Sequence, residues 1–95
     1  MDRLGVSFRS SLSPEEIRSQ YIRPLRAAVE AARSGVYSNY LRQEDVDPNQ
    51  PTEHLIVFLV RNFKDGVRLI RTEMDKLERP DELQLHNLNP SNPMY

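Results

Sequence analysis

The residues best suited to chemistry are basic side chains that recur at spacings of three and four in the second half of the chain: Arg61, Lys64, Arg68 and Arg71. On a helix this spacing places them on one face. Arginine guanidinium groups contact phosphate oxygens, so such a row could follow a nucleic-acid backbone. The more ordinary interpretation is that the charges extend into water and pair with acidic residues four positions later, Asp65 and Asp75. Because no helix-turn-helix spacing or glycine-aromatic RNA motif occurs, we do not favour nucleic-acid binding.

A second candidate is an acidic stretch with oxygen-bearing neighbours: Glu44, Asp45, Asp47, Asn49, Glu53 and His54. Carboxylate oxygens are the ligands that hard cations prefer. If a calcium-binding loop began at Asp45, Gln50 would stand where the turn requires glycine, and Ile56 would stand where a bidentate glutamate belongs. We therefore predict a solvated loop and no metal site.

The remaining polar residues do not form a recognisable catalytic pattern. Neither His54 nor His86 has a serine, an aspartate or a glycine-rich turn at a spacing typical of a nucleophile and its base. The three glycines are far apart, and the sequence has no cysteine, so we predict no catalytic residue and no cofactor. Tyr37 and Tyr40 could anchor a partner, although packing against the core is the simpler interpretation.

Length and composition indicate one small domain. The chain has 95 residues, with 13 Lys and Arg against 14 Asp and Glu, and its formal net charge is -1. A basic surface would therefore have to be local. The longest apolar run, residues 55–60, is far shorter than the roughly 20 residues of a membrane span. We expect a cytoplasmic protein that does not bind membranes.

A helix is predicted over residues 14–34. Ser13 and Glu16 show the reciprocal pattern of a capping box at its start. Apolar residues then recur at spacings of three and four along one face: Ile17, Tyr21, Leu25, Ala28 and Ala32. Pro24 lies inside this pattern, so we expect a kink or break near Arg23.

A second, longer helix is predicted over residues 52–78. Its apolar residues alternate between spacings of four and three, which is a heptad pattern: Ile56, Val60, Phe63, Val67, Ile70, Met74 and Leu77. The competing interpretation is an α/β fold in which residues 55–60 form a buried strand and a helix begins near Lys64. We favour one helix because the pattern stays in phase across the supposed junction of strand and helix.

The two helices predict an all-α fold: a hairpin of two long antiparallel helices, joined by a loop over residues 35–51, in a domain over residues 12–79. The second helix carries a further apolar side that includes one polar and one small residue: Leu55, Phe58, Asn62, Gly66 and Leu69. Because one partner helix cannot cover both sides, we predict that these residues contact a second subunit in a homodimeric four-helix bundle. Segments 1–11 and 80–95 lack a helical period and are expected to be flexible.

The function predicted from these patterns is that of a small non-enzymatic protein. We expect a protein–protein interaction, adaptor or regulatory protein that acts as a helical homodimer. The alternative is a nucleic-acid-associated regulator that uses the arginine-rich helix face. An enzyme with acid–base chemistry between Glu44 and His54 has little support, since no catalytic motif accompanies those residues.

Overall fold

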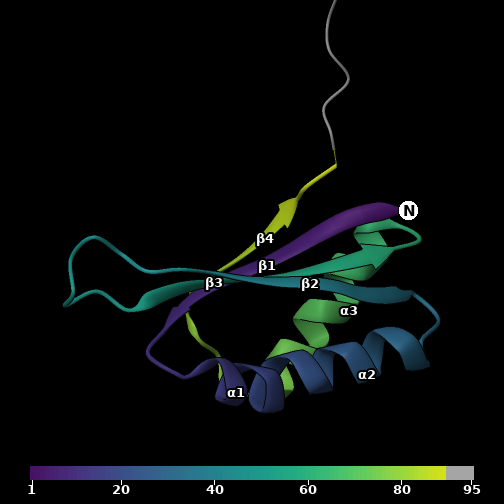
Figure 1. Cartoon of the computed structure of the whole chain (residues 1–95). Coiled ribbons are helices and arrows are strands. Elements are labelled where there is room, and N and C mark those ends of the chain that lie inside the picture. The colour runs from purple at the N-terminus through teal and green to yellow at the C-terminus, as the bar shows by residue number, and fades with distance from the viewer. Residues whose placement is uncertain (90–95) are drawn as a thin grey trace, which may run out of the picture.

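A computed structural model of the chain describes residues 1–89. The elements in chain order are β1 (Asp2–Ser10), α1 (Pro14–Ile17), the π-helical turn η1 (Arg18–Ile22), α2 (Arg23–Ala31), β2 (Gly35–Gln43), β3 (Thr52–Val60), α3 (Phe63–Lys76) and β4 (Asp81–Asn87). The fold is therefore α/β, with one sheet and two helical segments (Figure 1).

The four strands form one antiparallel sheet in the order β2-β3-β1-β4. The central strands β1 and β3 pair along their whole length, from Asp2 opposite Val60 to Ser10 opposite Thr52. Each helical segment joins two strands that run in the same direction but are separated by a third. This β-α-β-β-α-β order is the split β-α-β, or ferredoxin-like, topology.

The first helical segment begins as predicted. The Glu16 amide donates to the Ser13 hydroxyl at 3.2 Å and the Ser13 amide donates to the Glu16 carboxylate at 3.1 Å, which confirms the capping box. The break expected near Arg23 takes the form of η1, in which the Arg23 amide donates to the Arg18 carbonyl. The proline that follows has no amide hydrogen, and a π-helical turn is one way for a helix to pass such a position.

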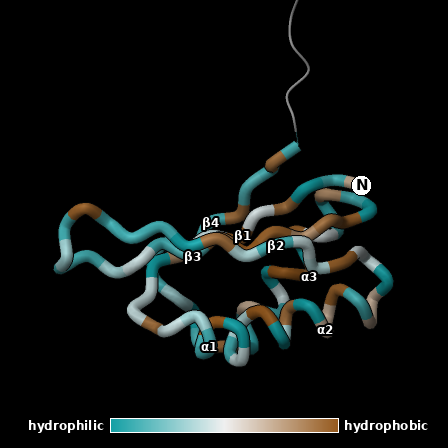
Figure 2. Tube along the Cα trace, viewed as in Figure 1, coloured by the Kyte–Doolittle hydropathy of each residue, from teal (hydrophilic) through white to brown (hydrophobic). Residues whose placement is uncertain are grey.

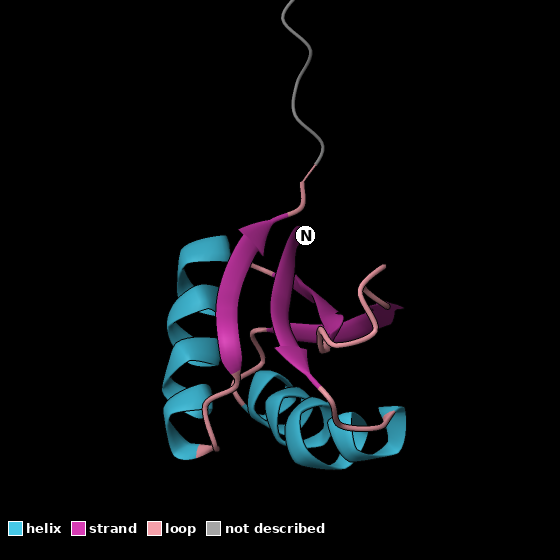
Figure 3. Ribbon diagram, turned by 90° about the vertical axis from the view of Figure 1, so that its left-hand side faces the viewer, coloured by secondary structure: helices cyan, strands magenta, loops and turns pink. Residues whose placement is uncertain are grey.

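Both helical segments lie on the same side of the sheet (Figures 1 and 3). Alternate residues of the strands point toward them and form one core with the buried helix residues. The core consists of Leu4, Val6, Phe8, Ile17, Tyr21, Ile22, Leu25, Val29, Ile56, Phe58, Val60, Ile70 and Met74. The other side of the sheet, which no helix of the described residues covers, is called the open face below.

The prediction of an all-α helical hairpin, and with it the four-helix bundle, is wrong. Residues 52–60 form strand β3, so the competing α/β interpretation is correct, and α3 begins only at Phe63. The cause is the spacing of Ile56 and Val60. Two residues four positions apart lie on the same side of a helix and on the same side of a strand, so the heptad pattern continues across the junction by coincidence.

Three other segments also contain strands that the sequence analysis did not predict. Segment 1–11 contributes the central strand β1, and the expected loop over residues 35–51 contributes β2. Segment 80–95, expected to be flexible, contributes the edge strand β4. The end of that segment, residues 90–95, lies outside the described residues. These strands form by pairing between segments that are far apart in the sequence. A search for helical periodicity cannot detect such pairing.

Candidate functional site

The open face is divided into an apolar and a polar half. Cross-strand pairing sets three rows across it: Val36, Leu59 and Arg3; Asn39, Val57, Gly5 and His86; Leu41, Leu55, Ser7 and Gln84. Strands β2 and β3 thus form an apolar half, which consists of Val36, Leu41, Leu55, Val57 and Leu59. Figure 2 shows the hydrophobic stretch of β3 in the middle of the sheet.

Four of the five residues of the apolar half are accessible to a partner, and the fifth, Val57, is buried. Val36 is 44% exposed and Leu41 is 50% exposed, while Leu55 and Leu59 are half-buried. Because Ile56, Phe58 and Val60 face the core, β3 is apolar on both of its sides over residues 55–60. An antiparallel strand with one side in water normally alternates apolar and polar residues, and a continuous apolar run is typical of a strand covered on both sides. The helices within residues 1–89 cover only one of these two sides.

Charged side chains stand at the two ends of the open face. Arg3, at one end, is exposed and forms no ion pair with any of residues 1–89. At the other end, the Arg9 guanidinium lies among three carboxylates: Asp45 at 3.2 Å, Glu53 at 3.7 Å and Glu82 at 3.0 Å. One end is therefore basic and the other carries an excess of negative charge.

The polar half of the open face contains a serine–histidine pair. The Ser7 hydroxyl lies 2.7 Å from His86 Nε2, within the reach of a nucleophile and its base. Ser7 is only 7% exposed, however, so its hydroxyl is poorly placed to attack a substrate. The contact instead links β1 to β4, and the sequence analysis missed it because it placed His86 in a tail.

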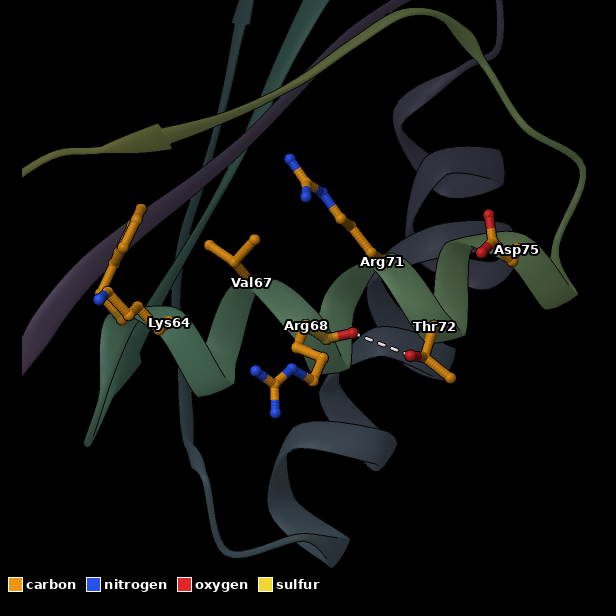
Figure 4. Close-up of a pocket in the computed structure, with 7 residues that line it drawn as sticks. Lys64, Val67, Arg68, Arg71, Thr72 and Asp75 are labelled. Carbon is orange, nitrogen blue, oxygen red and sulfur yellow. Dashed lines mark hydrogen bonds between the residues drawn. The ribbon is translucent and has the colours of Figure 1, made fainter.

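A second surface is a hollow of about 420 Å³ along one side of α3, called the α3 groove below. It is lined by Phe63, Lys64, Val67, Arg68, Arg71, Thr72 and Asp75. In Figure 4, Val67 lies between Lys64 and Arg71 along the helix, and Arg68 lies on the flank. The groove therefore combines an apolar centre with three cationic side chains around it.

The basic row predicted from the sequence is brought together only in part. Lys64, Arg68 and Arg71 line the α3 groove, but Arg61 lines another hollow beside Ser34 and Asn62. The expected pairs with Asp65 and Asp75 are not formed, because none of the four basic residues takes part in an ion pair among residues 1–89. Three cations of the α3 groove are thus available to an anionic ligand.

The five residues predicted to contact a second subunit do not share one surface. Phe58 and Gly66 are buried, and Leu69 packs against the core. Asn62 caps α3, because its side chain accepts a hydrogen bond from the Asp65 amide at 3.1 Å. Only Leu55 lies on the open face. Of its neighbours there, Val57 and Leu59 could have been found from the apolar run of β3, whereas Val36 and Leu41 come from β2.

The acidic stretch does not form a metal-binding arrangement in the described residues, where no group of three potential ligands converges. The Asp45 carboxylate accepts the Asp47 amide at 3.0 Å and pairs with Arg9. The hydrogen bond from the Asp47 amide, followed by the contact with Arg9, lowers the pKa of Asp45. The Asp45–Arg9 ion pair therefore holds the β2–β3 connection against β1.

The tyrosines near the end of the first helical segment pack within the protein. The guanidinium carbon of Arg18 lies 5.8 Å from the ring centre of Tyr40, and that of Arg26 lies 5.8 Å from the ring centre of Tyr37. Both distances suit a cation–π contact. These arginines therefore face β2 and do not extend the α3 groove.

His54 forms a buried polar contact in the core, where it is 0% exposed. Its Nε2 lies 3.0 Å from the Ser10 carbonyl, and its Nδ1 lies 2.7 Å from the Tyr40 hydroxyl. Because a carbonyl can only accept, Nε2 carries the proton and the Tyr40 hydroxyl donates to Nδ1. This pattern satisfies a neutral imidazole, and burial lowers the pKa of His54, with a smaller opposite effect from the Ser10 carbonyl.

We predict that the protein loses stability in mild acid because of His54. The unfolded chain binds a proton at this position at a higher pH than the folded chain, so the free energy of unfolding falls as the pH drops below about 6.5. Urea unfolding at about pH 7.5 and about pH 5.5 should differ by roughly 1 kcal/mol. His54→Gln, whose amide can make both hydrogen bonds without titrating, should remove most of this difference, and His86→Gln should keep it. An unchanged pH dependence in His54→Gln contradicts this assignment.

No model of a known protein family matches the chain, and no curated protein shows significant sequence similarity to it. None of the helices within residues 1–89 has the length and apolar character needed to cross a membrane. The open face and the α3 groove are the two surfaces of the described residues that are suited to binding a partner or a ligand.

Proposed function

We propose that this chain is a small non-enzymatic interaction protein that acts as a homodimer, in which two copies pack the open faces of their sheets together. The observation that carries the proposal is the apolar character of β3 on both sides. Its core side is covered by the helices, whereas Leu55 and Leu59 on the other side are only half-buried and need a cover of the same kind. Face-to-face packing of two sheets provides one.

The distribution of charge favours a second copy as that cover. A two-fold axis that lies between the sheets and perpendicular to the strands places each strand over its own copy and exchanges the two ends of the open face. The apolar halves then meet, and Arg3 of each copy lies over the acidic end of the other. Arg3 has no ion-pair partner within residues 1–89, and Glu53 at the acidic end is 47% exposed.

The size of the open face suits a stable dimer. Four strands spaced about 4.8 Å apart, with seven to nine residues at about 3.4 Å per residue, give a face of roughly 500 Å². Because side chains project from the sheet, the accessible area of this face is larger than the flat estimate and approaches the roughly 800 Å² per partner of a standard interface. Because the helices lie on the other side of each sheet, the dimer would present two α3 grooves outward.

The experiment that tests this proposal is a charge reversal measured by sedimentation equilibrium. Arg3→Glu and Glu53→Arg should each weaken the dimer about 5- to 10-fold, since each places like charges opposite one another. The double variant should regain the wild-type dissociation constant. Arg9 keeps Asp45 and Glu82 as partners when Glu53 is replaced, so folding is preserved.

Two results would count against the proposal. A wild-type protein that remains monomeric at every accessible concentration contradicts the homodimer. A double variant that dimerises no better than the single variants contradicts the two-fold arrangement, because Arg3 of one copy would then not lie close to Glu53, the neighbour of Arg9, in the other copy.

A further inference from the structure

The α3 groove differs from an ordinary charged helix surface in having an apolar centre. Phe63 and Val67 are half-buried and line the same hollow as the three cations. Its volume of about 420 Å³ lies in the range of sites that hold small molecules. A ligand that fills it must offer both an apolar surface and negative charge.

The cations of the groove are suited to phosphate. Arg68 and Arg71 carry planar guanidinium groups that donate two parallel hydrogen bonds to phosphate oxygens, and Lys64 adds a third positive charge. All three are exposed and have no ion pair within residues 1–89. The one carboxylate that lines the groove, Asp75, lies 3.8 Å from Arg79, so the groove keeps a net positive charge.

We propose that the α3 groove binds a nucleoside monophosphate. Its phosphate is held by Arg68 and Arg71, whose exposed side chains point to opposite sides of α3 in Figure 4 and turn toward one another when the ligand binds. Its flat base covers Phe63 and Val67, where aromatic and apolar contact favours a planar ring. This site is independent of the open face, since α3 lies on the opposite side of the sheet. The proposal therefore does not rest on the homodimer.

A single nucleotide fits the groove better than a long nucleic acid does. A track for a polynucleotide requires cations that continue beyond one phosphate. At one end of the row Arg61 lines a separate hollow, and at the other end Arg79, which shares a hollow with Arg71, is paired with Asp75. Arg18 and Arg26 stack over tyrosines near β2 and do not continue the row.

The test is a calorimetric titration of the full chain with adenosine 5′-monophosphate at low salt. Saturable binding that weakens as salt rises is expected, and the double variant Arg68→Ala, Arg71→Ala should bind at least about 10-fold more weakly. The matched control is Arg61→Ala, which removes an exposed arginine outside the groove and should leave the dissociation constant within about two-fold of wild type. Leu41→Glu, a substitution on the open face that should disrupt the dimer, should also leave nucleotide binding unchanged, which separates this site from the dimer.

Two further ligands test the two parts of the site. Inorganic pyrophosphate and adenosine should each bind more weakly than the nucleotide, since the first lacks the flat ring and the second lacks the phosphate. The proposal is overturned by absence of nucleotide binding at low salt, by equal loss in Arg61→Ala, or by pyrophosphate binding as tightly as the nucleotide. A single-stranded oligonucleotide that binds far more tightly than the nucleotide would also overturn it, in favour of a polynucleotide track.

Discussion

Leu41→Glu is expected to weaken the homodimer by at least about 100-fold, because each interface would then contain two buried carboxylates, one from each copy. Leu41 is 50% exposed in the single chain and faces away from the core, so its replacement leaves the packing of the helices on the sheet intact. Sedimentation equilibrium measures the dissociation constant, and urea unfolding of the monomer shows that the variant is folded.

The matched control for this variant is Val46→Glu. Val46 is a fully exposed apolar residue in the β2–β3 connection, outside the open face, so the same kind of change there should leave the dissociation constant unchanged. If both variants dimerise as the wild type does, the apolar half of the open face is not the interface. If both dissociate equally, general charge repulsion and not the open face explains the effect.

Gly35→Ala is expected to destabilise the protein by about 3 kcal/mol, because no space exists for a β-carbon at this position. A β-carbon on Gly35 would clash with the Leu59 carbonyl oxygen and would lie 2.7 Å from the Val60 α-carbon. Both are backbone atoms of β3, so β2 would have to move away from its partner. Since β2 supplies Val36 and Leu41 to the open face, dimerisation should weaken as well.

Gly66→Ala provides a control for this prediction. A β-carbon on Gly66 would approach side-chain atoms of Val60 and Leu4 at 3.0 to 3.2 Å, and these atoms can shift by a few tenths of an ångström. Alanine also favours a helix over glycine by about 1 kcal/mol, so the net change in the free energy of unfolding should lie within about 1 kcal/mol. If the two substitutions lower the free energy of unfolding equally in urea, the close contact of Gly35 with the β3 backbone is not the cause of the destabilisation.

The first helical segment could be predicted from the sequence because its signals are local. The capping box at Ser13 and Glu16 and the proline near Arg23 each act within one or two helical turns, and both have the expected consequence in the structure. The heptad pattern likewise reports a real helix from Phe63 onward, where residues at spacings of three and four face the core.

The sheet could not be predicted in the same way, because its strands are held by partners far away in the sequence. Strand β1 pairs with β3 across more than forty residues and with β4 across more than seventy. The apolar alternation of Leu4, Val6 and Phe8 is the local trace of β1, and it is too short to decide between a strand and a tail. The run over residues 55–60 fits either a strand or a helix, because Ile56 and Val60, four positions apart, lie on the same side of both.

The candidate sites show the same division between local and long-range information. Three cations of the α3 groove could be predicted because they lie on one helix. The apolar half of the open face combines residues of β2 and β3, which come together only when those strands pair. The sequence does indicate a second apolar side on the segment around Leu55. Because the segment was assigned to a helix, however, the residues predicted to share that side with Leu55 were the wrong ones.

The most direct test of the homodimer is a distance measurement between spin labels on two copies. The chain has no cysteine, so a single label can be placed at Asn39→Cys, on the open face, or at Lys76→Cys, near the end of α3. Sheets packed about 10 Å apart should bring the Asn39 labels close together, whereas the Lys76 labels should lie roughly 30 Å or more apart because both sheets separate them. Absence of coupling between Asn39 labels, or a shorter distance between the Lys76 labels, would contradict the face-to-face dimer.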